Sequence, residues 1–252
     1  MKSFNYGLLF VFLILWGCDR DLELNSKDFV FSRAASEHTL LANAPFADRG
    51  LLNPHDDFVN AKRGLIVLAP NIGPLGYDGQ PIWDPSDTIF TGVEPPATVN
   101  PSLWRQARLN SFRGLFEVED EIFQIRGFDL ANMTLIKSEN GWIIVDPLTT
   151  IESTRAAIEF AELHLGAIIP TAIIISHSHI DHFGGVQNLI ARSNNDDLPI
   201  IAPSGFLYEA TSENILAGPA MARRASYMMG FELDTSVFGH VDSGLGKRVI
   251  SG

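Results

Sequence analysis

Short apolar segments alternate with amphipathic helical segments between residues 115 and 215, and this alternation constrains the fold more than any other feature of the chain. Residues 150–165 place apolar side chains at helical spacing, and Gly166 follows where a helix C-cap belongs. Residues 171–176 (TAIIIS) form a short apolar run that is typical of a strand buried on both faces of an α/β layer. The alternation predicts a layered α/β domain, but it does not select one α/β fold.

Turn residues between these segments define the remaining elements. Asn140-Gly141 is a strong signal for a hairpin between two predicted strands. The predicted strands are 63–69, 115–118, 122–126, 133–137, 142–145, 171–176 and 199–202. The predicted helices are 103–109, 150–165, 183–192, 204–210 and 218–229.

The chain before residue 114 has a different character. Prolines recur from Pro70 to Pro101 and break any long helix or strand there, and the segment shows no sustained period. We therefore interpret residues 29–113 as an irregular wrap that packs on the α/β domain of residues 114–252, and not as a separate domain.

The N-terminus has the pattern of an export signal. Lys2 precedes an apolar stretch at residues 8–16, which is too short to span a membrane, since a span needs about 20 residues. Cys18 is the sole cysteine and ends a segment that resembles a bacterial lipobox, and Asp19 resembles an inner-membrane retention signal. We expect a signal peptide at 1–18, lipidation of Cys18, a tether at 19–28 and a periplasmic location with a lipid anchor as the membrane contact. An ordinary cleaved signal with an incidental Cys18 is the alternative.

The charge balance argues against two classes of partner. Asp and Glu total 30 against 18 Lys and Arg, which gives a net charge of -12. Nucleic acids and anionic lipids both favour clustered cations, so neither is expected as a partner. Any site for an anionic substrate must be local, built from metal ions or a few arginines.

The strand predicted at 171–176 leads directly into a histidine cluster, which we define as His177, His179, Asp181 and His182. His177 and His179 are two residues apart, so on an extended stretch both point to the same side and can bind one ion. Asp181 and His182 follow as the chain turns and can reach a second ion. Zinc favours imidazole and carboxylate ligands, so the cluster predicts a hydrolytic site with two zinc ions. A polar loop that only caps the next helix is the alternative.

The histidine cluster, followed by Gly184-Gly185, resembles the metal-binding motif of the metallo-β-lactamase superfamily. The resemblance implies an αββα sandwich, of which residues 114–252 supply the first half as an incomplete catalytic domain. It also implies that the two histidines of the HxH unit hold one zinc ion and that Asp181 and His182 hold the other. Asp181 is the candidate catalytic residue.

A narrower resemblance extends over nearly the whole chain after the tether. The strings that carry it are 46–49 (FADR), 57–64, 100–105 (NPSLWR), 114–118 (GLFEV), 124–132, 142–150, 176–185, 212–214 (SEN), 221–225 (MARRA) and 244–247 (GLGK). Their order resembles the alkylsulfatases, which hydrolyse detergent-like sulfate esters. The resemblance implies water activated by two ions, an apolar groove for the alkyl tail of a small-molecule alkyl sulfate, release of alcohol and sulfate, and a homodimer for the full-length protein.

Three further residues acquire candidate roles from these resemblances. Asp146 matches the family aspartate that supports the metal site from outside the ligand set, or it is a turn residue before Pro147. Arg223 and Arg224 could bind the sulfate group, because guanidinium geometry suits its oxygens. Paired arginines on a helix are also common as a solvated or salt-bridged face.

The sequence departs from the alkylsulfatase pattern after the histidine cluster. In that family the remaining metal ligands are carboxylates and a histidine further along the chain, whereas here His240 and a few acids follow His182. We interpret the sequence as a C-terminally truncated fragment that binds metal weakly. Two alternatives remain: another hydrolase of the superfamily, such as a lactonase or thioesterase, and a non-catalytic metal-binding lipoprotein.

Overall fold

A computed structural model describes residues 34–47, 54–70, 79, 94–230, 233 and 236–242. These residues belong to one compact unit, Ala34–Gly252. The predicted signal peptide, the tether and Cys18 lie outside the described residues. None of the helices in the described ranges is both long enough and apolar enough to cross a membrane.

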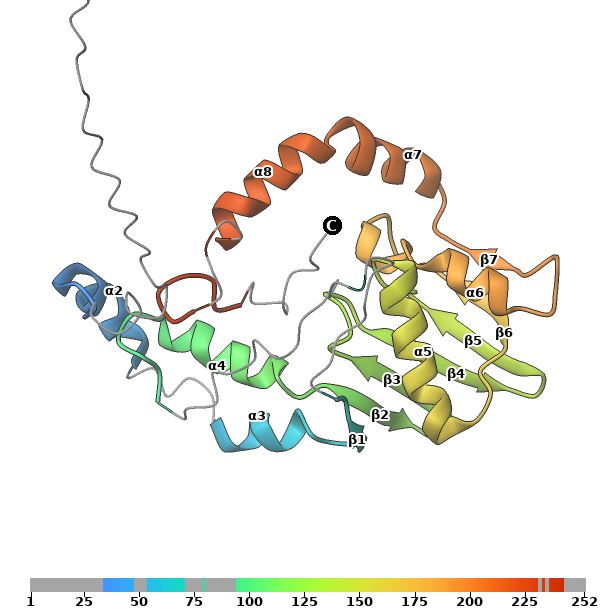
Figure 1. Cartoon of the computed structure of the whole chain (residues 1–252), viewed down its shortest axis with the longest axis horizontal. Helices are drawn as coiled ribbons and strands as arrows, with labels where there is room; N and C mark the ends of the chain where they lie inside the picture. Colours follow the sequence, from blue (N-terminus) through green and yellow to red (C-terminus); the bar gives the residue numbers. More distant parts are fainter. Residues whose placement is uncertain are drawn as a thin grey trace, which may run out of the picture. The chain divides into compact units, whose positions relative to one another are not determined.

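The centre of the unit is a seven-stranded sheet in the order β1-β2-β3-β4-β5-β6-β7 (Figure 1). Strands β1 to β5 pair antiparallel, whereas β5, β6 and β7 are parallel. The strand bounds are β1 Leu65–Leu68, β2 Gly114–Glu119, β3 Ile122–Arg126, β4 Met133–Ser138, β5 Gly141–Val145, β6 Pro170–Ile174 and β7 Ile200–Ile201. The predicted α/β class and the predicted strands are confirmed.

The helix between β5 and β6 makes their parallel pairing possible, because a parallel connection needs a crossover element. Helix α5 spans Ile151–Leu165. Thr150 is its N-cap, with a side chain that accepts a hydrogen bond from the Ser153 N–H, and Gly166 is its C-cap, with a φ of 76°. The predicted helix and its glycine cap are therefore confirmed. The apolar face of α5 buries Ala157, Ile158 and Ala161 completely.

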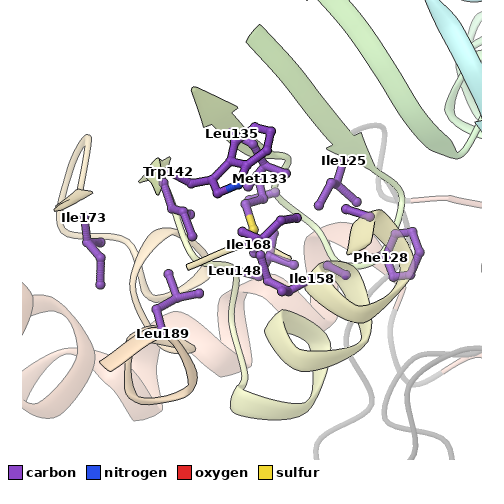
Figure 2. Packing of buried hydrophobic residues seen from close by; sticks show 14 of the residues in the cluster. Ile125, Phe128, Met133, Leu135, Trp142, Leu148, Ile158, Ile168, Ile173 and Leu189 are labelled. Carbon is purple, nitrogen blue, oxygen red and sulfur yellow. The ribbon is translucent and has the colours of Figure 1, made fainter. Parts of the chain in front are cut away.

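Helix α5 and helix α6 (Val186–Arg192) cover one face of the sheet. One hydrophobic cluster combines residues of β2 to β6 with residues of both helices (Figure 2). Trp142 adds a polar link, since its indole Nε1 donates to the Ala167 carbonyl oxygen at 3.1 Å. Full burial of a Leu, Ile or Val side chain stabilises the folded state by about 1.5–3 kcal/mol. The cluster therefore holds the ends of β5 and β6 in place against α5 and α6.

Two details of the last strands differ from the prediction. Strand β6 is shorter than 171–176 and is buried at Pro170 and Ile173 but only half-buried at the residues between them. Both residues of β7 are exposed, Ile200 at 44% and Ile201 at 54%. The expectation of a strand buried on both faces is therefore wrong for β6, because one face packs on the helices while the other is partly open.

The segment before residue 114 contains more regular structure than the irregular wrap that we expected. Helices α2 (Glu37–Ala47) and α3 (Pro54–Asn60) were not expected. Helix α4 (Pro101–Asn110) matches the helix predicted at 103–109, and β1, which pairs antiparallel with β2, matches the strand predicted at 63–69. Pro101 is compatible with the first turn of α4, because the backbone N–H groups of a first helical turn have no partner within the helix. Asn100 caps α4, since its side chain accepts a hydrogen bond from the Ser102 N–H. The predicted division at residues 113 and 114 stays a prediction, although the sheet itself extends across it.

The chain after β7 is helical. Helix α7 (Phe206–Thr211) runs into a π-helical turn, η3 (Ser212–Leu216), and then into α8 (Gly218–Met229) (Figure 1). The segment 236–242 then reaches the region of α4, where Thr98 Oγ1 donates to the Val237 carbonyl oxygen at 2.6 Å. Val99, Trp104 and Val241 form a second, smaller apolar cluster there.

Candidate metal centre

The histidine cluster lies in the loop that leaves β6 and in the short 3₁₀ helix η2 (Ile180–His182). The ring centroid of His177 is 4.0 Å from that of His182 and 4.6 Å from that of His179. Asp181 Oδ2 lies 3.3 Å from His182 Nε2. The structure therefore brings all four predicted side chains together at the carboxyl end of β6, where open α/β sheets place their sites.

Asp146 links this loop to the end of the neighbouring strand β5. Its carboxylate accepts from the Ser176 backbone N–H at 2.8 Å, from the Ser176 hydroxyl at 2.7 Å and from His182 Nδ1 at 2.9 Å. The backbone at Asp146 has a φ of 58°, a left-handed conformation that non-glycine residues rarely adopt. Asp146 is therefore held in an unusual conformation that places its carboxylate under the histidine loop, rather than serving only as a turn residue.

These hydrogen bonds assign a proton to one nitrogen of two histidines. A carboxylate only accepts, so His182 Nδ1 carries a proton, while His182 Nε2 faces Asp181 Oδ2 at 3.3 Å. Ser176 uses its hydroxyl proton on Asp146, so His177 Nδ1, 2.9 Å from the Ser176 oxygen, is the donor in that contact. Burial, and then repulsion from the imidazoles of His182 and His179, lowers the pKa of His177 and favours the neutral, ligand-competent ring.

His179 is anchored from the other side of the loop. Its Nε2 lies 2.9 Å from Glu213 Oε1, and the Ser178 hydroxyl donates to Glu213 Oε2 at 3.3 Å. Sequence reasoning did not single out Ser176 or Glu213 as site residues. Both lie in strings shared with the alkylsulfatases (176–185 and 212–214), but the spacing along the chain gives no sign that Glu213 returns to the loop.

Two glycines allow the loop to pack closely on the start of α5. A Cβ on Gly185 would lie 1.8 Å from Thr154 Oγ1 and 2.3 Å from the Pro147 carbonyl oxygen. A Cβ on Gly184 would lie 1.9 Å from the Thr149 carbonyl oxygen. The Gly-Gly pair is therefore needed because the backbone there touches the loop that follows Asp146, and helix α6 begins only at Val186 and not at residue 183.

The side chains have the donor chemistry of a zinc site, but they do not form a complete one. In the part of the chain that the structure describes, no group of three or more His, Cys, Asp or Glu side chains is arranged to hold a metal ion. Asp181 contacts His182, and Glu213 contacts His179. The predicted roles of the four ligands stay predictions.

The remaining predicted site residues lie on α8. Both Arg223 and Arg224 are exposed, and Arg224 Nε lies 3.3 Å from Met228 Sδ within the same helix. Among the described residues, neither arginine forms a hydrogen bond or ion pair with the histidine cluster. Their assignment to sulfate binding stays a prediction.

An open apolar cavity of about 550 Å³ adjoins the loop on the β7 side. Its lining includes Ile175, Ile200, Phe206 and Leu207 from β7, α7 and the end of β6. Ile175 is two residues before His177 in the chain, but no residue of the histidine cluster lines the cavity.

Comparison with known proteins agrees with this geometry. A family model described as the metallo-beta-lactamase superfamily matches residues 126–203, which contain the histidine cluster and Asp146. The chain is 44% identical over 228 residues to an (R)-specific secondary-alkylsulfatase from Pseudomonas sp., and this match covers 89% of the chain and 33% of the relative. It is 40% identical over 222 residues to a linear primary-alkylsulfatase from Pseudomonas sp., covering 86% of the chain and 32% of the relative. The chain is a homologue of the alkylsulfatases.

A solved structure shows that this homology extends to the fold. The stereoselective inverting sec-alkylsulfatase Pisa1 from Pseudomonas sp. superimposes with a TM-score of 0.81 at 41% identity, over 88% of this chain and 36% of that one. The metallo-β-lactamase fold predicted for this alkylsulfatase homologue is therefore confirmed. The chain spans about a third of the length of the alkylsulfatases that it matches.

Proposed function

We propose that this alkylsulfatase homologue supplies the histidine-rich part of a metal-dependent sulfate-ester hydrolase, which converts an alkyl sulfate and water to an alcohol and sulfate. The observation that carries the proposal is the convergence of His177, His179, Asp181 and His182 above Asp146, within a chain similar to alkylsulfatases over nearly nine-tenths of its length.

We assign the side chains of the loop to two metal ions. His177 and His179 would bind one zinc ion, and Asp181 with His182 the second. Zinc, when bound, lowers the pKa of water and neutralises developing negative charge. Asp146 accepts the hydrogen bond of His182 Nδ1 and, through Ser176, orients His177 Nδ1, so Nε2 of each ring is the nitrogen that would bind a metal ion.

The substrate's two ends call for different surroundings. The sulfate group carries a negative charge, and the chain has a net charge of -12, so binding must depend on the metal ions and local cations, with Arg223 and Arg224 as candidates. The alkyl tail needs an apolar surface, and we assign it to the cavity lined by Ile175, Ile200 and Phe206.

The test is zinc binding and turnover by the purified chain. Zinc affinity is measured by competition with a chromophoric chelator, and sulfate release is measured with one secondary and one linear primary alkyl sulfate. His177→Ala is expected to weaken zinc binding, whereas His38→Ala, at an exposed position far along the chain from the cluster, serves as the matched control. A chain that binds zinc but cleaves a lactone or thioester in preference to both sulfates would contradict the proposed substrate class.

We also propose that the protein is exported, lipidated at Cys18 and held at the periplasmic face of the inner membrane. Cys18→Ala is expected to move it from the membrane fraction to the soluble periplasmic fraction. An unchanged membrane fraction would contradict lipid anchoring. A homodimer is proposed for the full-length protein, and light scattering coupled to gel filtration measures it.

A further inference from the structure

The π-helical turn η3 reaches back to the histidine loop through two adjacent side chains. Glu213 Oε1 lies 2.9 Å from His179 Nε2, and Glu213 Oε2 accepts from the Ser178 hydroxyl at 3.3 Å. Asn214 Nδ2 donates to the Ser178 carbonyl oxygen at 3.3 Å and to the Ala210 carbonyl oxygen at 2.8 Å. Three contacts therefore join the turn to the loop, although the residues lie about 35 positions apart in the sequence.

The Glu213 contact determines which nitrogen of His179 remains available. The Glu213 carboxylate oxygen lies against Nε2 as an ion-pair partner, so Nδ1 is the ring nitrogen of His179 that this contact leaves open. On the opposite side, Asp146 accepts from His182 Nδ1 at 2.9 Å, while His182 Nε2 faces Asp181 Oδ2 at 3.3 Å. A carboxylate that holds the second ring nitrogen of a metal ligand fixes its tautomer and ring orientation and raises its basicity.

The backbone of η3 explains why adjacent residues can act together on the loop. A π turn widens the helix by one residue and is frequently found at functional sites. Here the turn directs Glu213 and Asn214 to the same residue, Ser178, from consecutive positions. Asn214 also bonds back to Ala210 in α7, which ties the contact to the preceding helix.

We propose that Glu213 is a positioning residue that orients His179 for metal binding, with Asn214 bracing the loop at Ser178. The inference rests on the proposed metal-dependent function and adds to it a residue outside the histidine cluster. The side chain of Glu213 is 27% exposed and that of His179 is 56% exposed, so both are accessible from solvent.

The test compares three single variants in the whole chain. Glu213→Ala removes the acceptor, Glu213→Gln keeps a neutral acceptor of the same size, and Glu209→Gln makes the same charge change at an exposed position four residues earlier. Zinc affinity is measured by chelator competition, and folding is checked by thermal unfolding of the metal-free protein. We expect Glu213→Ala to bind zinc about 10–100-fold more weakly, as is usual when such a supporting group is lost. Glu213→Gln is expected to recover part of this loss, and Glu209→Gln to match the unmodified chain.

Nitrogen-15 NMR of the zinc-loaded chain shows which ring nitrogen of each histidine binds the metal. If Glu213 only stabilised the fold, its replacement would leave the His179 ring signals of the zinc-loaded chain unchanged. Metal is expected on Nδ1 of His179, with Nε2 still protonated, and on Nε2 of His182. In Glu213→Ala the Nε2 signal of His179 is expected to move, because the carboxylate next to it is removed.

Two contrary results have different meanings. If the unmodified chain takes up no zinc, the proposed metal-dependent function fails, and the inference fails with it. If the unmodified chain binds zinc and Glu213→Ala binds it equally well, or His179 is metallated at Nε2, the proposed function stands and the role of Glu213 is overturned.

Discussion

The two carboxylates that hold the histidine loop belong to very different parts of the molecule. Asp146 follows a strand of the central sheet, its side chain is 13% exposed, and it accepts three hydrogen bonds. Glu213 lies on a five-residue π turn between two short helices, and its side chain is 27% exposed. One side of the loop is therefore attached to the core, and the other to a surface element.

This difference indicates that the two supports contribute differently. The ends of β5 and β6 are fixed by parallel pairing and by the cluster around Ile144, Leu148 and Ile173, so Asp146 orients His182 before any metal binds. The residues around η3 include exposed apolar side chains such as Ile215 (69%) and Leu216 (79%). The Asp146 side should therefore serve both stability and metal binding, and the Glu213 side metal binding alone.

The largest effect is expected from Asp146→Asn, because asparagine tolerates the left-handed backbone but replaces one acceptor oxygen with a donor. At least one of the three donors that Asp146 now satisfies would lose its acceptor, at a cost of about 1–3 kcal/mol. Zinc affinity should also fall by about 10–100-fold. Urea unfolding and chelator competition measure the two effects.

Asp196→Asn is the matched control for this change, since Asp196 is exposed in the loop between α6 and β7. If Asp146→Asn weakens zinc binding without lowering the free energy of unfolding, Asp146 does not contribute to stability, and the expected difference between Asp146 and Glu213 is wrong.

The next largest effect on stability is expected at Gly185, where the loop packs closely on the start of α5. Gly185→Ala would place a methyl group against Thr154 Oγ1 and the Pro147 carbonyl oxygen, and overpacking of this kind typically costs about 1–3 kcal/mol. Gly218→Ala is the control, because a Cβ there meets its nearest atom at 4.0 Å. Equal unfolding midpoints in urea for the two variants would show that the loop does not depend on this close approach.

A smaller effect on stability is expected at the surface support. Glu213→Ala should change the free energy of unfolding of the metal-free protein by no more than about 1 kcal/mol, since partly exposed ion pairs contribute little. The comparison with Asp146→Asn under the same urea conditions tests the asymmetry directly. If the two variants lose similar stability, η3 is part of the folding core and the distinction between the two supports is wrong.

Much of the fold could be predicted from sequence because local signals and tertiary structure agree there. The Asn140-Gly141 turn, the Thr150 cap and the Gly166 cap each fix an element boundary with their own side chain or backbone. Helices α2 and α3 and the open face of β6 were not predicted. Helix α2 contains Pro45, and the exposure of β6 depends on what packs against the sheet, so short-range pattern does not determine either.

The site was predictable to the extent that its residues are close in sequence. His177, His179, Asp181 and His182 lie within one loop, and Asp146 ends the adjacent strand, so strand order alone brings them together. Glu213 joins them through a π turn that ordinary helical periodicity does not reveal. The sequence therefore shows that Glu213 carries a carboxylate, but it does not show that the chain returns to the histidine loop at Glu213.

The smallest effect is expected from the pH dependence of a third carboxylate on the core side. Asp129 is 2% exposed, and it accepts from the Thr149 N–H at 2.9 Å and from the Thr149 hydroxyl at 2.7 Å, in the segment that follows Asp146. Burial raises the pKa of Asp129 above its ordinary value of 3.8, although these hydrogen bonds oppose the shift.

Because the pKa is raised in the folded state, the folded chain holds the Asp129 proton over a pH range in which the unfolded chain has lost it. The stabilising contribution of Asp129 is therefore complete below the ordinary pKa and declines as pH rises through the folded-state value. Asp129→Asn removes this titration, so the difference in free energy of unfolding between the unmodified chain and the variant should shrink as pH rises across the acid range. Urea unfolding of both proteins at several pH values measures it, with Asp196→Asn as the exposed control. A difference that grows with pH instead would mean that the Thr149 hydrogen bonds outweigh burial, and that Asp129 braces the Asp146 segment as a carboxylate rather than as a neutral acid.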